Sequence, residues 1–164
     1  MMMFRGALMF KLLWITLLVY ALDQASKLAA VRHLTRQSLE IAPFLNFSLA
    51  YNTGAAFSFL SDAGGWQNVF FVVVAIVVVI VMIGMLWRLG TNDIQVAVAL
   101  MLVLGGAIGN VTDRIRLGYV VDFIDVYYGS WHWPTFNVAD SAIFVGAVLL
   151  ILDAVGWRFG KRHS

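Results

Sequence analysis

The sequence predicts an all-α membrane protein that crosses the bilayer four times, and three observations carry this prediction. Of its 164 residues, 62% are hydrophobic and only 12% are charged, whereas about a quarter of the residues in soluble domains are charged. Two segments, residues 66–87 and 94–112, contain no charged side chain. Two further apolar segments, residues 8–30 and 134–157, contain only a few. Since a spanning helix needs ~20 residues, residues 1–164 accommodate all four spans in a single domain.

The two charge-free segments are the clearest spans. Residues 66–87 are rich in β-branched side chains, but the run is too long for a strand, and lipid requires backbone hydrogen bonds within the segment. A tryptophan stands at each of its ends, as is typical of side chains at the two membrane interfaces. Near the end of the next span, residues 105–109 read Gly-Gly-Ala-Ile-Gly. Such a pattern of small residues permits close contact between helices.

The amino-terminal span and the distribution of charge predict the orientation. Arg5 precedes an apolar run, as in a secretory signal peptide, but residues 20–25 offer no convincing cleavage site, so we expect the segment to be retained. Basic residues are denser in the short segments next to the two termini, which predicts that both termini are cytoplasmic. Seven of the nine acidic residues then lie at or beyond the outer ends of the spans: Asp23, Glu40, Asp62, Asp113, Asp122, Asp125 and Asp140.

The segment between the first two spans predicts two small outer elements. Apolar and polar residues alternate over residues 45–51, which favours a strand lying against the bilayer or another apolar surface. Residues 27–37 are typical of a short interfacial helix, with Lys27, Arg32 and Arg36 on its polar side. Lipid headgroups would attract such a helix.

Asp140 is the first candidate for chemistry because it lies inside a predicted span. An ionisable side chain at such a place is functional by default. If the helix begins at Pro134, Asp140 lies ~9 Å below the outer interface, and Asn137 shares its helical face. The alternative is a structural Asp that bonds a neighbouring helix or pairs with Arg114.

Asp122 is the natural partner of Asp140, since apolar residues flank it on both sides. Taken alone, it would be a turn residue. Two carboxylates in an apolar site share one proton, because both cannot ionise together. One carboxylate then deprotonates a water while the other protonates or polarises a carbonyl. This arrangement hydrolyses an amide without a metal or a covalent intermediate.

Other polar residues near the span ends have simpler explanations. Asp113 and Arg114 close the third span and are explained by local pairing. Asn110 lies one helical turn before Arg114 and faces the same direction. Asp23 and Lys27 are spaced as an i,i+4 salt bridge at a helix end.

Several other chemistries are excluded by their missing residues. The chain has no cysteine and its three histidines are isolated, so we expect no disulfide, no thiolate chemistry, no metal site and no cofactor. It has no Gly-x-Ser-x-Gly elbow and no phosphate-binding Gly-x-x-x-x-Gly-Lys loop. Its basic residues form no patch interleaved with aromatic side chains, which argues against nucleic-acid binding.

Length, four spans and five motifs in order make the chain resemble the bacterial lipoprotein signal peptidases (signal peptidase II). The motifs are Asp-Gln-Ala-Ser-Lys at 23–27, Asn-Thr-Gly-Ala-Ala-Phe at 52–57, Gly-Gly-Ala-Ile-Gly-Asn at 105–110, Val-Asp-Phe-Ile-Asp at 121–125 and Phe-Asn-Val-Ala-Asp-Ser at 136–141. Each motif alone is weak, but five in register are specific. The resemblance covers nearly the whole chain.

The resemblance implies an aspartic endopeptidase of the bacterial cytoplasmic membrane, with its active site near the outer face. Members of this family cut prolipoproteins before a cysteine that already carries diacylglycerol. The matching catalytic pair is Asp122 and Asp140, and the alternating segment would match the family's periplasmic β-cradle. Substrate-binding and supporting positions fall on Asp23, Lys27, Asn52, Asn110, Arg114 and Asn137. We expect a monomer that contacts membrane lipids and is inhibited by globomycin-type cyclic peptides.

Two non-enzymatic functions compete with this one. Carboxylates inside a membrane also mark ion pathways, so a small proton-coupled carrier or channel is the main alternative. A structural subunit that packs through the glycines of residues 105–109 is the other. The gathering of acids on one face, with no relay across the membrane, favours the peptidase.

Overall fold

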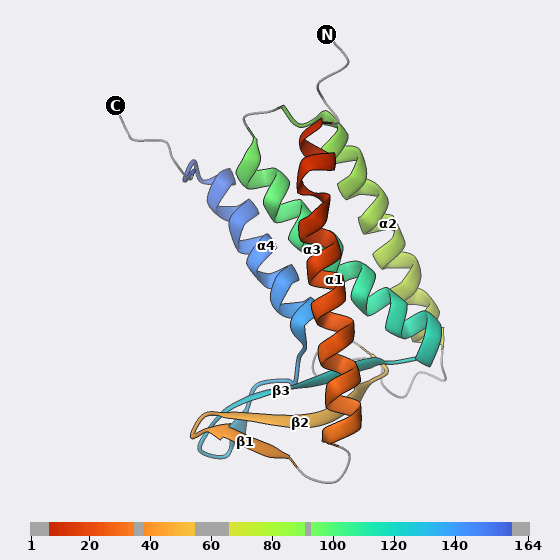
Figure 1. Cartoon of the computed structure of the whole chain (residues 1–164), viewed down its shortest axis with the longest axis vertical. Helices are drawn as coiled ribbons and strands as arrows, with labels where there is room; N and C mark the ends of the chain where they lie inside the picture. Colours follow the sequence, from red (N-terminus) through yellow and green to blue (C-terminus); the bar gives the residue numbers. More distant parts are fainter. Residues whose placement is uncertain (1–6, 35–37, 55–65, 91–92, 159–164) are drawn as a thin grey trace.

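Four helices and one small sheet make up the described part of the chain, which comprises residues 7–34, 38–54, 66–90 and 93–158. Figure 1 shows the computed structural model, in which the helices form a bundle and the sheet lies at one end of it. The start of α1 and the end of α4 lie at the other end. The helices are α1 (Ala7–His33), α2 (Trp66–Arg88), α3 (Ile94–Leu117) and α4 (Val138–Ala154).

Three of these helices, α1, α2 and α3, are long and apolar enough to cross a membrane. They correspond to the first three predicted spans, although α3 continues to Leu117 and not only to residue 112. The fourth predicted span contains α4, which has 17 residues, somewhat fewer than the ~20 of a full crossing. Its start differs from the prediction: residues 134–136 are not helical, and the helix begins at Val138 after the capping residue Asn137.

The core of the bundle is the middle of α3, whose small residues allow α1 and α4 to approach closely. A Cβ atom on Gly105 would collide with Val19 of α1, and one on Gly106 would collide with the carbonyl of Ala139 in α4. The close helix contact predicted for residues 105–109 is therefore confirmed. By contrast, most side chains of α2 are exposed, as a lipid-facing helix requires.

The sheet is antiparallel with strand order β1-β2-β3-β4. Its strands are β1 (Leu39–Ala42), β2 (Leu45–Asn52), β3 (Val120–Tyr128) and β4 (Trp131–His132). Strand β2 is the predicted alternating segment. It pairs with β3 so that Ala50 lies opposite Asp122, after a register shift between Phe47 and Ala50. The sheet thus ties the segment after α1 to the segment after α3.

The predicted interfacial helix over residues 27–37 is wrong for the described residues. Residues 27–33 simply continue α1, and Lys27 is buried at 3% exposure and does not face lipid headgroups. The reason is that its ammonium group has acceptors on α3 as well as on α1. Three charged residues that the sequence analysis names lie outside the described residues: Arg5, Arg36 and Asp62.

Candidate active site

Asp122 and Asp140 come from two elements that the backbone holds side by side. Asp122 lies in β3, and Asp140 lies in the first turn of α4. Just before α4, Phe136 exchanges two backbone hydrogen bonds with Ile124 of β3, at 2.8 and 3.0 Å. Because this bridge seats the start of α4 against β3, the two carboxylates reach one site although 18 residues separate them in the sequence.

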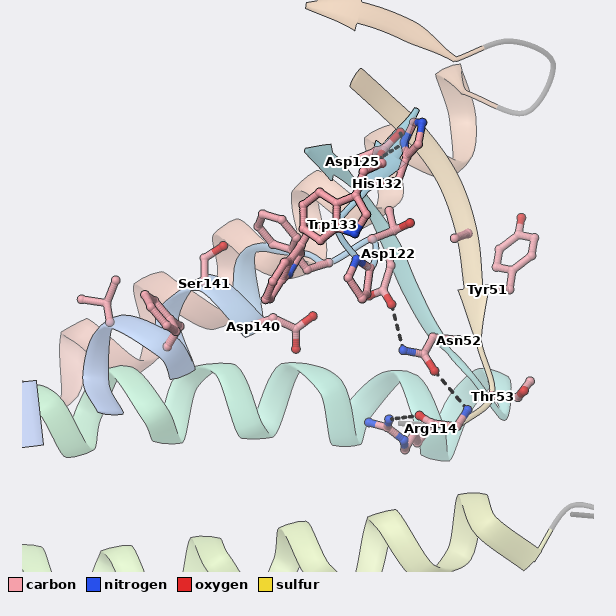
Figure 2. A pocket seen from close by; sticks show the side chains of 18 residues that line it. Tyr51, Asn52, Thr53, Arg114, Asp122, Asp125, His132, Trp133, Asp140 and Ser141 are labelled. Carbon is pink, nitrogen blue, oxygen red and sulfur yellow. Dashed lines mark hydrogen bonds and ion pairs between the residues drawn. The ribbon is translucent and has the colours of Figure 1, made fainter. Parts of the chain in front are cut away.

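Both carboxylates line one cavity of 1240 Å³ at the sheet end of the bundle. Figure 2 shows their side chains directed into the same space, with Asn52 bonded to Asp122 and Arg114 near Asn52. Pockets of ~300–1,000 Å³ hold drug-sized ligands, so this cavity has room for an extended peptide segment. Aromatic side chains form much of its remaining wall: Tyr51, Trp131, Trp133, Phe136 and Phe144.

Asn137 connects the two carboxylates. Its side-chain Nδ2 donates to Asp122 Oδ1 at 2.7 Å, and its backbone N–H donates to Asp140 Oδ2 at 3.3 Å. Its Oδ1 in turn accepts the backbone N–H of Asp140 at 2.9 Å, which completes a capping box at the start of α4. Asn137 is fully buried, so the residue that starts the helix also fixes the two acidic side chains relative to each other.

A buried polar network supports Asp140 from the side of α1 and α3. Asn110 Nδ2 donates to Asp140 Oδ1 at 2.7 Å, and Lys27 Nζ donates to Asn110 Oδ1 at 2.9 Å. The predicted ion pair of Lys27 with Asp23 is present at 2.8 Å, but it is buried between helices and is not a surface pair at a helix end. Asp23 also accepts the backbone N–H of Ala139 at 2.9 Å, which fastens α1 to the start of α4.

Asn52 and Arg114 join the site next to Asp122, at the turn that follows β2. Asn52 Nδ2 donates to Asp122 Oδ2 at 3.0 Å, while its Oδ1 accepts the N–H of Gly54 at 3.0 Å. Arg114 donates from Nη2 to the carbonyl of Gly54 at 3.2 Å, and its guanidinium lies 5.3 Å from the centre of the Phe71 ring. The alternative pairing of Asp140 with Arg114 is replaced by the amide bonds to Asp140, and Arg114 joins the site through the turn after β2.

The environment of Asp122 disfavours its charged form. Burial, and next the negative charge of Asp140, raise the pKa of Asp122 from 3.8 to about 6, against the opposing effect of the hydrogen bonds from Asn52 and Asn137. Each pKa unit corresponds to about 1.4 kcal/mol, so keeping a proton on Asp122 at pH 7 costs only about that much. Asp122 can therefore exchange a proton near neutral pH at a small free-energy cost.

Three further polar residues take part in the site region although the sequence analysis did not assign them to it. Asp113 does not need Arg114 as its partner, because it forms an ion pair with Lys27 at 2.9 Å. Gln24 donates to Asp113 Oδ1 at 3.0 Å. In the cavity wall itself, His132 Nδ1 bonds Asp125 at 2.8 Å. One feature of the sequence could have placed Asp113 in the site: it follows Asn110 by three residues and therefore lies on the same face of the helix.

Fold and site together define a class of protein: a helical membrane protein with a small sheet and a carboxylate-lined cavity at one end of its helices, as expected of a membrane hydrolase. The family described as signal peptidase (SPase) II matches residues 15–156. The lipoprotein signal peptidase of Pseudomonas putida is 56% identical over 86% of this chain and 84% of its own length. That of Aeromonas hydrophila is 48% identical over 93% of this chain and 91% of its own.

Solved structures agree with these sequence relatives. A bacterial membrane enzyme solved at 2.3 Å superposes with a TM-score of 0.77 at 31% identity, covering 92% of this chain and 91% of the other. A second, solved at 1.9 Å, gives the same TM-score at 32% identity over 87% of this chain. The chain belongs to the signal peptidase II family, and it is a membrane-embedded peptidase.

Proposed function

We propose that this peptidase cleaves with a water molecule activated by Asp122 and Asp140, and that it cuts just before the diacylglyceryl-modified cysteine of its substrate. Family membership gives the overall reaction: the protein removes signal peptides from prolipoproteins. The observation that supports the catalytic pair is the contact of one buried residue, Asn137, with both carboxylates inside one cavity.

The proposed chemistry needs one proton on the pair. The ionised carboxylate takes a proton from water, and the hydroxide formed attacks the carbonyl carbon of the scissile amide. The protonated carboxyl group stabilises the carbonyl oxygen by donating a hydrogen bond. The C–N bond then breaks, and the leaving nitrogen receives the proton that the other carboxylate took from water. The raised pKa of Asp122 fits a pair that shares a proton, because two close carboxylates resist simultaneous ionisation.

The surrounding polar residues would divide into two groups. Asn110 and Asn137 orient the carboxylates through their side-chain amides, whose donors point at Asp140 and Asp122. Asn52, which bonds Asp122, and Arg114 also line the cavity and would steady the substrate backbone or the developing oxyanion. Asp23 and Lys27 act at a distance from the substrate by holding α1 against the start of α4.

Three long apolar helices and the position of the sheet at one end of the bundle support the proposed placement in the membrane. The helices would span the bacterial cytoplasmic membrane, with α4 as a short fourth span and with both termini in the cytoplasm. The sheet end and its cavity would then face the outer leaflet, where a lipid-bearing cysteine is anchored. We expect a monomer in contact with membrane lipids, and we expect globomycin-type cyclic peptides to compete with the substrate for the cavity.

Neither non-enzymatic alternative gains support. A proton carrier needs titratable groups along its path, whereas Asp122, Asp140 and their buried carboxylate neighbours all lie at the sheet end of the bundle. The glycines of residues 105–109 pack against α1 and α4 of the same chain, which accounts for them without a partner subunit.

Single substitutions of the two carboxylates test the proposal. Purified Asp122→Asn and Asp140→Asn proteins in detergent are expected to cleave a diacylglyceryl-modified prolipoprotein at least about 10²-fold more slowly, the contribution typical of general acid–base groups. Asp153→Asn is the matched control: Asp153 lies in α4, as Asp140 does, but near the other end of the helix and outside the cavity lining, where its carboxylate pairs with Arg158 at 2.8 Å. We expect its turnover to stay within about threefold of normal. Normal turnover in either Asp122→Asn or Asp140→Asn contradicts the proposal.

A further inference from the structure

We infer that Asp113 is a positioning residue for the catalytic pair. It lies outside the cavity lining and acts on both carboxylates through other residues. This inference rests on the proposed roles of Asp122 and Asp140. The side chain of Asp113 is buried, at 5% exposure. Its Oδ2 atom accepts from Lys27 Nζ at 2.9 Å and from the backbone N–H of Val121 at 3.2 Å. One oxygen atom thus stands at the junction of two chains of contacts, and each chain ends at one catalytic residue.

The first chain of contacts leads to Asp140. An ammonium group only donates hydrogen bonds, so Lys27 Nζ, at 2.9 Å, selects the carbonyl oxygen of the Asn110 amide. The same amide must then turn its NH₂ group the other way, where it donates to Asp140 Oδ1 at 2.7 Å. Asp113 holds Lys27 at the position that enforces this orientation, because its negative charge gives a short, charge-assisted bond.

The second chain of contacts leads to Asp122. Val121 immediately precedes Asp122 in β3, and its N–H is the group that Asp113 accepts. The carbonyl of Val121 accepts from Asn137 Nδ2 at 3.3 Å, and the same nitrogen also donates to Asp122. Asp113 therefore fastens the strand that carries Asp122 to the end of α3.

Asp23 and Asp113 share Lys27 but fasten it to different elements. Asp23 pairs with Lys27 at 2.8 Å and binds the N–H of Ala139 in α4. Asp113 pairs with it at 2.9 Å and binds the N–H of Val121 in β3. A lysine between two carboxylates in this way sets the separation of α4 and β3. The distance between the two catalytic carboxylates follows from that separation.

Asp113→Asn isolates the charge of this side chain, because the new amide retains an oxygen that can accept from Val121. We expect kcat to fall about 10–100-fold, the usual effect of displacing a catalytic group by about 1 Å, while KM stays within threefold. Thr112→Val is the matched control one residue away: within the described residues its hydroxyl bonds the carbonyl of Ile108 on its own helix and no other group, and we expect unchanged kcat. Should Asp113→Asn fail to fold, Asp113→Ser, which leaves room for a water, takes its place. Its kcat and KM are then compared with those of Thr112→Val in the same way.

A double variant separates positioning from a general loss of structure. If Asp113 acts through Lys27 and Asn110, then Asp113→Asn combined with Asn110→Ala lowers kcat no more than about threefold below Asn110→Ala alone. The inference is overturned if the losses of kcat from Asp113→Asn and Asn110→Ala multiply in the double variant. It is also overturned if Asp113→Asn alone keeps a kcat within threefold of normal, or raises KM without lowering kcat. Asp122→Asn and Asp140→Asn are assayed beside it. If these two are inactive and Asp113→Asn is normal, only the inference fails; if either turns over normally, the catalytic proposal fails.

Discussion

Asn137 donates its side-chain amide to Asp122 at 2.7 Å and at the same time caps the helix that carries Asp140. These two tasks use different atoms: Nδ2 contacts Asp122, and Oδ1 accepts the N–H of Asp140. One side chain therefore both starts the helix and positions the proposed catalytic pair. Substitutions that keep one task and remove the other can separate their contributions.

Asn137→Ser keeps a helix-capping oxygen but removes the amide donor to Asp122. We expect kcat to fall about 10–100-fold. The free energy of unfolding should fall by about 1–3 kcal/mol, because the buried acceptors on Asp122 and Val121 lose this donor, while the capping oxygen is retained. Asn137→Ala removes both atoms and should lower the free energy of unfolding by about a further 1 kcal/mol. Thermal unfolding in detergent and cleavage kinetics measure the two effects, and equal stability of the two variants would contradict the capping role.

The stability of the protein should depend on pH through Asp122. Its folded pKa of about 6 lies above the ordinary value of 3.8, so the folded state binds this proton more tightly than the unfolded state. The stabilisation is fully present below pH 3.8 and is lost as pH rises through about 6. A shift of about two units corresponds to about 3 kcal/mol. The difference between the wild-type protein and Asp122→Asn should therefore change between pH 4 and pH 7, and a constant difference would be evidence against the raised pKa.

Close packing of α4 on α3 predicts a cost for Gly106→Ala. The added Cβ would collide with the carbonyl of Ala139, two residues into α4, and overpacking of this kind costs about 1–3 kcal/mol. We expect a lower unfolding temperature and lower activity, because the start of α4 positions Asp140. Gly84→Ala in α2 is the control, since its new Cβ meets no atom within 4 Å among the described residues, apart from its own helix backbone and chain neighbours. Similar losses in both variants would show that the effect is not specific to the α3–α4 contact.

Much of the fold could be predicted because a segment within lipid must satisfy its own backbone hydrogen bonds, which leaves few possible structures. Charge-free runs as long as residues 66–87 and 94–112 have few structural solutions. Strand β3 was not predicted, because residues 120–125 are mostly buried on both faces and show no alternation. The start of α4 was misplaced because proline favours the first turn of a helix, but here the capping box of Asn137 with Asp140 starts the helix four residues later. The depth of ~9 Å predicted for Asp140 assumed a helix that begins at Pro134. That depth is therefore wrong, because Asp140 lies in the first turn of α4.

The candidate site could be predicted only in part, for reasons that concern partners far apart in sequence. Asp122 and Asp140 were identifiable because charge is scarce and these two residues lie in apolar segments. Lys27 was assigned to a polar surface, since nothing near it in the sequence indicates that Asn110 and Asp113 are its partners. For the same reason Asp113 was paired with its neighbour in the chain. Local spacing predicts contacts along one helix, whereas these contacts cross between helices.

The central claim is that Asp122 and Asp140 work as one unit, and the kinetics of the double variant test it most directly. Groups that act together lose nearly all their effect when either is removed. We therefore expect Asp122→Asn/Asp140→Asn to cleave a diacylglyceryl-modified prolipoprotein at a rate within about tenfold of either single variant, with all three at least about 10²-fold below the wild-type protein. Losses that multiply in the double variant, or wild-type turnover in one single variant, would contradict a shared catalytic pair.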